Sequence, residues 1–269
     1  IGVVPSVMQG GLPVLLKMII NGTADMALPP HDRISTLCRK FGCVSLPFVF
    51  DDHEHADRVL DDEFLSWATP ELESFGLSFL GSWEWGFRQI TNAVRPILTP
   101  QDMRGLKIRV PPVLHYQAAI EALGATPVAV EFGQLADVIK DGIVDGQENP
   151  VSIIHGLGLY EWQRYLSVVN YNYSTIVHLI NKKSFENLSS EQQQILREES
   201  QRAGALMRQI VRAHEVNQLA ALFGLGMQVD RPDLAPFKAA MGAANERLTS
   251  MYRADNVAAF LAMVERHRK

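Results

Sequence analysis

A short strand that ends at two consecutive prolines is the feature that most constrains the fold of this chain. Lys107–Val110 alternates charged and apolar side chains at the strand's period of two. Pro111 and Pro112 end this strand, because neither residue can donate a hydrogen bond to a sheet. Strand and helix patterns then alternate as far as Pro150, which predicts an α/β fold.

The alternation after Pro112 predicts four further elements. They are a helix over 113–123, a strand over 126–130, a helix over 133–140 and a strand over 143–147. Gly124 ends the first helix, and the apolar residues of the second recur on one face. The segment GQENP is expected to follow the last strand as a loop.

Arg109 and Asn149 are candidate ligand-binding residues within this segment. Arg109 lies near the carboxyl end of its strand, where open α/β sheets bind ligands, and a guanidinium can hold a carboxylate or phosphate with two hydrogen bonds. Asn149 precedes Pro150, which favours an extended backbone, and its amide can both donate and accept. The alternatives are an ordinary surface ion pair for Arg109 and a helix cap for Asn149.

Two tryptophans follow a predicted strand at 76–81. We expect Trp83 and Trp85 to point to opposite sides of an extended stretch, one into the core and the other toward a pocket wall. Core packing of both is the alternative. Earlier in the chain, the patterns predict strands at 1–5 and 25–28, a helix at 12–20, and a helix that begins at Asp51 or Asp52 and runs through Leu60.

Two late strands and a long helix complete the pattern. The strands are predicted over 165–171 and 174–181. A chain that crosses between domains near 170–175 would place Tyr171 or Tyr173 at a cleft. Ser189 and Gln192 form a capping-box pattern for a helix that reaches about Phe223. Such a helix exceeds the diameter of a small domain and should lie across two lobes.

Composition excludes several classes of protein. The 269 residues suit one large domain or two modest ones, and 47% hydrophobic with 20% charged residues describe a soluble globular protein. A net charge of −5 argues against nucleic-acid binding. No apolar run approaches the length that spans a bilayer, and no signal-peptide pattern is present. A periplasmic protein would have lost its signal before residue 1.

Neither a metal centre nor a catalytic motif is expected. Cys38 and Cys43 could form a disulfide in an oxidising compartment or remain buried thiols, and their spacing is not that of a zinc site. His53 and His55 are two residues apart and so lie on different helix faces. No complete nucleophile, phosphate-loop or dinucleotide motif is present, so we expect no enzyme activity and no cofactor.

Several longer motifs occur in one order along the chain. The central ones are GLKIRV, EALGATPVAVEFGQL and DGIVDGQENP, and the flanking ones are NGTADMAL, LPFVFDDHEHADRVL, GFRQITNAVRPILTPQDM and INKKSFENLSSEQQQIL. In this order they resemble the solute-binding proteins of tripartite ATP-independent periplasmic (TRAP) transporters, the DctP-like family. The resemblance covers most of the chain, which makes it more specific than any single motif.

The resemblance implies an α/β fold like that of periplasmic binding proteins, type II-like, with two lobes around a ligand cleft. Crossing strands and the long helix would join the lobes. The implied lobes are 1–86 with 175–215, and 87–174 with 216–269. In the resembled family a strand and a long helix precede the first elements of this sequence. We expect either a truncated chain or an N-terminal segment that is not included, which bears on any ligand contact that this strand would supply.

The expected ligand-binding residues are Arg88, Arg109, Phe132, Asn149, Tyr171, Trp83 and Trp85. By the resemblance, Arg88 and Phe132 face the ligand, Arg88 through polar contacts and Phe132 as part of an aromatic lining. Arg109 would clamp the ligand carboxylate. One of the two tryptophans would help Phe132 to cover the apolar part.

The sequence therefore predicts an extracytoplasmic solute receptor of a TRAP-type transporter. It would bind a small organic acid in the cleft, close around it on a hinge, and deliver it to membrane subunits. The alternatives are a sensory binding module for a signalling partner and an α/β enzyme that acts on carboxylic acids. Two arginines fit either a dicarboxylate or one carboxylate with a hydroxyl or keto oxygen.

Overall fold

The computed structural model describes residues 12–269, so the strand expected at 1–5 lies outside the described residues. The strands are β1 (Met26–Ala27), β2 (Leu77–Asn92), β3 (Lys107–Val110), β4 (Thr126–Ala129), β5 (Gly146–Pro150), β6 (Tyr165–Ser167), β7 (Tyr173–Asn181) and β8 (Gln228–Asp230). The helices up to the fifth strand are α1 (Leu12–Asn21), α2 (His31–Ile34), α3 (Arg39–Cys43), α4 (His53–Asp61), α5 (Glu63–Glu73), α6 (Leu114–Ala122) and α7 (Leu135–Lys140). The later helices are α8 (Val151–Gly156), α9 (Lys182–Glu186), α10 (Ser190–Gly224), α11 (Ala235–Ala239), α12 (Gly242–Tyr252) and α13 (Ala254–Arg266).

β2 is the strand on which both parts of the sheet are built. Its first part pairs antiparallel with β7, from Leu77 opposite Asn181 to Phe87 opposite Tyr173. Its second part pairs antiparallel with β5 and β6. The chain therefore has one sheet region of order β1-β7-β2 and another built from β2, β5, β3 and β4, with β6 and β8 beside it. Both regions share β2, which crosses between them.

The strand predicted over 76–81 is only the first third of β2. The pairing with β7 continues through two irregularities, one between Phe79 and Gly81 and one between Glu84 and Gly86. Gly86 has a φ of +102°, a backbone conformation that favours glycine. Nearly every side chain of β2 is buried on both faces, so the sequence has no polar–apolar alternation that would reveal the strand's full length.

The central strand–helix prediction is confirmed in outline. β3 pairs in parallel with both β4 and β5, as an α/β segment requires. The bounds predicted for the strand over 143–147 are wrong. The strand is Gly146–Pro150, so the segment expected to be a loop is itself the strand. The polar residues of β5 are all buried and pair with β2. A run of polar residues predicts a loop when only the sequence is known, which is why the strand was missed.

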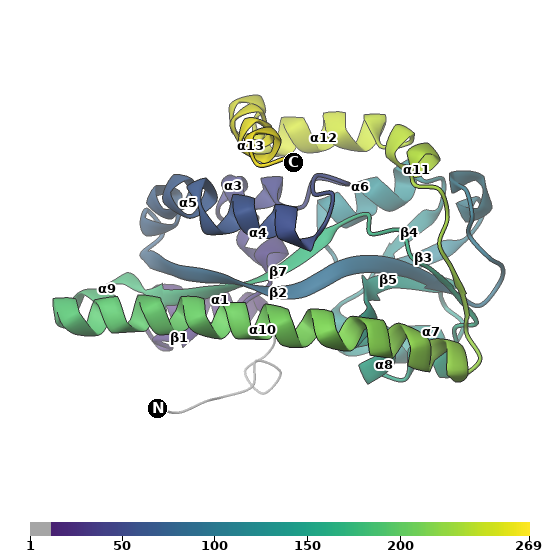
Figure 1. Cartoon of the computed structure of the whole chain (residues 1–269), viewed down its shortest axis with the longest axis horizontal. Coiled ribbons are helices and arrows are strands. Elements are labelled where there is room, and N and C mark those ends of the chain that lie inside the picture. The colour runs from purple at the N-terminus through teal and green to yellow at the C-terminus, as the bar shows by residue number, and fades with distance from the viewer. Residues whose placement is uncertain (1–11) are drawn as a thin grey trace.

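α10 runs along the sheet for most of the long dimension of the molecule (Figure 1). Its 35 residues correspond to about 50 Å at 1.5 Å per residue. The predicted capping box is present, because the Ser189 hydroxyl accepts from the backbone of Gln192, whose side chain accepts in return. Figure 1 shows α4, α5, α12 and α13 on the other side of the sheet from α10.

The core of the described residues contains one large cluster and two smaller ones, the third formed by Leu80, Ile180 and Phe185. The large cluster includes Phe41, Phe64, Phe79, Tyr116, Leu248 and Phe260. The second cluster includes Leu135, Ile154, Leu166 and Leu222. The assignment of residues to two lobes stays a prediction. The contacts of α12 and α13 are relevant to it. Both helices are assigned to the second lobe. α12 packs on α6 of that lobe and also on α3 of the first, and α13 contacts α3, α4 and α5 of the first.

Cys38 and Cys43 are both buried free thiols. Burial raises the pKa of both, that of Cys43 to about 12, which keeps them protonated and poorly reactive. None of the helices within residues 12–269 is both long and apolar enough to cross a bilayer.

Gly204 is where α10 makes a close approach to β2. A Cβ at this position would lie 2.9 Å from Cδ1 of Trp83 and 3.1 Å from the carbonyl oxygen of Ser82. We expect Gly204→Ala to lower the free energy of unfolding by about 1–3 kcal/mol, because the helix would have to move away from the strand. Urea unfolding measures this change.

Gly224, the last residue of α10, is the matched control, because a Cβ there would meet no atom within 4 Å. Gly224→Ala should leave stability unchanged or raise it by up to about 1 kcal/mol, since alanine favours helix. Equal losses in the two variants would contradict the close packing at Gly204.

Candidate functional site

Three neighbouring strands bring the predicted polar residues together. Arg88 of β2 lies opposite Pro150 of β5, and Arg109 of β3 lies opposite Gln147 of β5. Asn149 is therefore adjacent to both arginine-bearing strands. Arg88 is 3% exposed and Arg109 is fully buried. The sheet thus places the two guanidinium groups near each other, close to the segment where the chain returns from β6 to β7. We call Arg88, Arg109, Asn149 and the residues that contact them the polar cluster.

Arg88 has its counter-ion within the protein. Nε and Nη2 of Arg88 donate to the two carboxylate oxygens of Glu148, the second over 2.8 Å. Nη2 also donates to the side-chain oxygen of Asn149 over 3.1 Å, and the guanidinium lies 4.5 Å above the ring of Tyr116. Burial opposes the charge of Arg88, but Glu148 outweighs it and raises the pKa of Arg88 above its usual value. The charge of Arg88 is therefore balanced internally.

Tyr171 completes the Glu148 site from the crossing segment. Its hydroxyl donates to Oε2 of Glu148 over 2.6 Å. Burial, and then the carboxylate of Glu148, raise the pKa of Tyr171, so the hydroxyl stays protonated and acts as a donor. The structure thus places Tyr171 in the polar cluster, as a support for Glu148.

Arg109 has no such counter-ion. Its Nε and Nη2 both donate to the carbonyl oxygen of Val130, over 2.9 and 2.5 Å. Its Nη1 is buried and has no hydrogen-bond partner among residues 12–269. Burial lowers the pKa of Arg109 to about 10; the charge of Glu148 offsets this in part, and the charge of Arg88 adds to it. A buried guanidinium without an opposing carboxylate is a site that requires an anion.

A second group of polar residues approaches from α2. His31 accepts from the backbone NH of Thr175 over 3.0 Å and donates to the Ser45 hydroxyl over 2.6 Å, and burial lowers its pKa, so it is neutral. Asp32 is 5% exposed, and its Oδ1 has no partner in the described part of the chain. Arg33 pairs with Glu131 over 2.7 Å, which joins α2 to the end of β4.

Asn149 is hydrogen-bonded within the protein, whereas the side chain of Phe132 is partly exposed. The amide of Asn149 accepts from Arg88 and donates to Oε1 of Gln147 over 2.5 Å. Phe132 begins a short 3₁₀ turn (Phe132–Gln134) and is 42% exposed. It follows Glu131 and the Val130 carbonyl that holds Arg109, so it borders the cluster. Its role, like that of the other candidate residues, stays a prediction.

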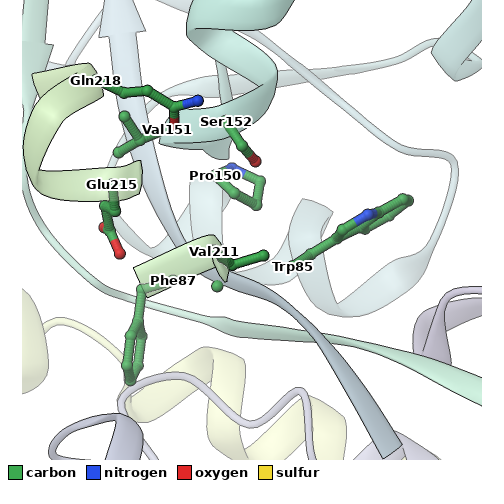
Figure 2. Close-up of a pocket in the computed structure, with 9 residues that line it drawn as sticks. Trp85, Phe87, Pro150, Val151, Ser152, Val211, Glu215 and Gln218 are labelled. Carbon is green, nitrogen blue, oxygen red and sulfur yellow. The ribbon is translucent and has the colours of Figure 1, made fainter. Parts of the chain in front are cut away.

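The two tryptophans lie apart from this cluster, and the expectation that they point to opposite sides is wrong. Residues two apart in a strand share a face, and both tryptophans meet α10. Trp83 donates from its indole nitrogen to the carbonyl oxygen of Ser200 over 3.0 Å. Trp85 borders a cavity of about 10 Å³ with Val211 of α10 and Pro150, as Figure 2 shows. Space of that size holds about one water molecule.

Sequence reasoning missed Glu148, Tyr116 and Asp32. Glu148 lies inside the GQENP motif. A carboxylate in a fully buried strand needs a cationic or hydrogen-bonding partner, so recognising this segment as a buried strand would have indicated Glu148. Tyr116 reads as an ordinary apolar helix residue. Asp32 lies in a four-residue helix with no distinctive pattern, so no sequence signal indicates it.

A buried ion-pair network lies where β2 crosses between the two sheet regions. Glu84 of β2 is fully buried, and Arg212 of α10 donates to its carboxylate over 2.9 Å and to Asp57 of α4 over 2.8 Å. Nδ1 of His53 lies 2.7 Å from Oε1 of Glu84, as an ion pair without hydrogen-bond alignment. Charged groups of α4, β2 and α10 therefore meet at the crossing point.

One group of side chains has a spacing that a metal ion could use. Ligand atoms of Asp62, Glu63 and His267 lie within 4.8 Å of one another. However, His267 already contacts Asp62, and Glu63 pairs with Arg266, at the protein surface. The group therefore carries no metal assignment.

Two sheet regions that share β2, with a long helix running along them, are the framework of a solute-binding protein. The chain belongs to the family described as bacterial extracellular solute-binding protein, family 7 (DctP), which matches residues 1–251. This is the family of TRAP solute-binding proteins, so the resemblance seen in the sequence is confirmed.

Named relatives and solved structures agree with this assignment. The chain is 30% identical over 225 residues to the 2,3-diketo-L-gulonate-binding periplasmic protein of Escherichia coli, covering 84% of this chain and 69% of that protein. It is also similar to a TRAP periplasmic solute-binding protein from Polaromonas sp. JS666 bound to D-erythronate, with 29% identity, a TM-score of 0.88, and 96% and 85% coverage. A TRAP protein from Roseobacter denitrificans with bound β-D-glucuronate shows 27% identity, a TM-score of 0.88, and 94% and 83% coverage.

The His53 network makes stability depend on pH. Burial by itself lowers the pKa of His53, but Glu215 and Glu84 more than offset this and raise it to about 9. Since the pKa of an unfolded histidine is about 6.5, this stabilisation is complete below pH 6.5 and is lost as pH rises through about 9. Its size is about 3 kcal/mol at most.

We therefore expect His53→Gln to lower the free energy of unfolding at pH 6 and to have little effect at pH 10. Urea unfolding at both values measures the difference. His214→Gln, which changes an exposed histidine of α10, is the control. A loss of the same size at both pH values would show that the charge of His53 is not responsible.

Proposed function

We propose that this protein is the extracytoplasmic receptor of a TRAP-type transporter and that it binds a small organic acid through Arg109. The observation that supports the proposal is the buried Nη1 of Arg109, which has no partner among residues 12–269. A ligand carboxylate would supply the missing negative charge and the missing acceptor. The named relatives bind sugar acids, which carry such a carboxylate.

In this proposal the other residues of the cluster support the clamp. Glu148 and Tyr171 hold Arg88 in place, so that Arg88 and Asn149 present donors to other polar atoms of the ligand. Phe132 covers one side of the ligand. The two lobes close around it, and the closed receptor delivers it, in the periplasm, to the membrane subunits.

Two other functions would use the same cluster. A sensory module would bind the same acid and pass the signal to a different partner, which the absence of transport subunits beside its gene would indicate. An enzyme would convert the acid. Recovery of unchanged ligand after long incubation with the protein supports the receptor, and a new product would contradict it.

Substitution of Arg109 tests the clamp directly. Arg109→Met should weaken carboxylate binding by about 3 kcal/mol or more, because the ligand charge would be buried unpaired. Arg109→Lys should weaken it nearly as much, because lysine lacks the planar fork. Isothermal titration calorimetry against a sugar-acid panel measures both, with the exposed Arg104→Ala as control.

The same Arg109→Met variant should be more stable than the wild type without ligand, by about 1–3 kcal/mol, because an unpaired buried charge is removed. Urea unfolding measures this gain. Near-native affinity in both Arg109 variants would overturn the assignment of Arg109.

The Arg33–Glu131 ion pair should slow the release of ligand. It connects α2 to the end of β4, and both partners lie next to residues of the polar cluster. The pair can form only when these segments meet, so Glu131→Gln should raise the dissociation rate by roughly two- to fivefold, the range of a partly exposed ion pair. Stopped-flow release measurements detect such a change.

The double variant Arg33→Glu with Glu131→Arg should recover part of the slow release, since it restores the attraction with the charges reversed. Asp255→Asn, which breaks a local pair with Arg253, should have no effect. Identical release rates in the wild type and Glu131→Gln would rule out this role.

A further inference from the structure

The charges of the polar cluster leave two groups unbalanced. Glu148 neutralises Arg88, and Glu131 pairs with Arg33. Within residues 12–269, Arg109 has no carboxylate partner and Asp32 has no cationic partner within ion-pair distance. Among these residues, one positive charge and one negative charge are therefore left without an ion-pair partner.

Asp32 has no cation in the side chains next to it. His31, the preceding residue, is neutral because burial lowers its pKa, and its ring nitrogens are engaged by Thr175 and Ser45. His115 stacks on His31 at 6.4 Å between ring centroids, and burial lowers its pKa well below the usual value. The neighbouring Arg33 is directed to Glu131. The Oδ1 atom of Asp32 is thus free to accept hydrogen bonds from a ligand.

A second acceptor without a partner lies on the same side of the cluster. The amide nitrogen of Asn172 donates to the carbonyl oxygen of Ser45 over 2.8 Å, while its Oδ1 is buried and unpartnered in the described chain. Ser45 also binds His31, the residue before Asp32. Two buried side chains, Asp32 of α2 and Asn172 of the crossing segment, therefore each have an oxygen acceptor without a donor in the described chain.

The distribution of these groups defines the ligand. Arg109, whose Nη1 is an unpartnered donor, requires a carboxylate. Asp32 and Asn172, whose oxygens are unpartnered acceptors, require groups that donate hydrogen bonds. Hydroxyl groups satisfy them without adding charge, whereas a second carboxylate would face the carboxylate of Asp32 and be repelled. A dicarboxylate needs two free cations, and Arg88 is not free.

We infer that Asp32 is a specificity-determining residue that selects hydroxylated monocarboxylates and rejects dicarboxylates. This inference rests on the proposed carboxylate receptor and deepens it. The fold alone does not dictate the selection, because it depends on one acidic side chain in a short helix and on the internal neutralisation of Arg88 by Glu148.

The test compares D-gluconate with D-glucarate, which share a hydroxylated six-carbon chain and differ in the second carboxylate. Adipate, a dicarboxylate without hydroxyl groups, is the third probe. Calorimetry with the wild type should give affinity for D-gluconate at least about tenfold higher than for the other two, since like charges in contact cost a kcal/mol or more.

Asp32→Asn removes the charge and keeps both the size and an oxygen acceptor. In this variant the preference for D-gluconate over D-glucarate should fall by roughly tenfold, because the repulsion is gone. Asp141→Asn, an exposed acid in the turn after α7, should keep the wild-type preference. Circular dichroism and unliganded melting temperatures verify that the variants fold.

The outcomes separate this inference from the proposed function. If acids bind through Arg109 but the D-gluconate to D-glucarate ratio is the same in the wild type and Asp32→Asn, the receptor stands and the role of Asp32 is overturned. A wild-type preference for D-glucarate or adipate overturns it as well. If neither these acids nor the wider sugar-acid panel binds the wild type, the receptor function fails and this inference with it.

Discussion

The pairing of β2 along its whole length is the interaction on which the rest of the structure depends. Its first part belongs to the β1-β7-β2 region, and its second part pairs with β5 and β6, so a single strand carries the chain from one sheet region to the other. Arg88 lies just after this crossing, opposite the end of β5. The backbone hydrogen bonds between β2 and β5 therefore bring Glu148 and Asn149 close to Arg88. Arg208 and Arg212 of α10 pair with acids of α4 over the crossing itself and hold the long helix there.

The two buried arginines differ in how their charges are balanced within the protein. Arg88 is satisfied by Glu148, and a buried pair with several hydrogen bonds can be held without large cost. Arg109 donates hydrogen bonds only to the carbonyl oxygen of Val130 among the described residues, so its buried charge destabilises the unliganded protein. Such a cost is expected at a functional site, where groups are held ready for a ligand instead of for one another. The contrast between these residues is visible only in the structure, because it depends on Glu148, which the strand pairing brings to Arg88 and not to Arg109.

Much of the fold was predictable because its signals are local. The period of β3, the prolines after it and the capping box at Ser189 are all short-range patterns, and each element formed as expected. β5 was misread because its buried polar residues, Glu148 among them, lack the apolar character on which strand prediction depends. Of the site, Arg88, Arg109 and Asn149 were predicted and lie in one cluster. Asp32 could not be predicted, since its importance comes from what the three-dimensional surroundings fail to provide.

The position of the two tryptophans against α10 has a spectroscopic consequence. Trp83 is hydrogen-bonded to the backbone of α10, and Trp85 lies beside Val211 of the same helix, so neither ring belongs to the polar cluster around Arg109. Their emission reports the contact between the crossing strand and the helix that spans the molecule. In a variant with Trp67 and Trp162 replaced by phenylalanine, a change in fluorescence on adding an acid would therefore measure the relative movement of these two elements, and its rate would be the rate of closure instead of the rate of ligand contact.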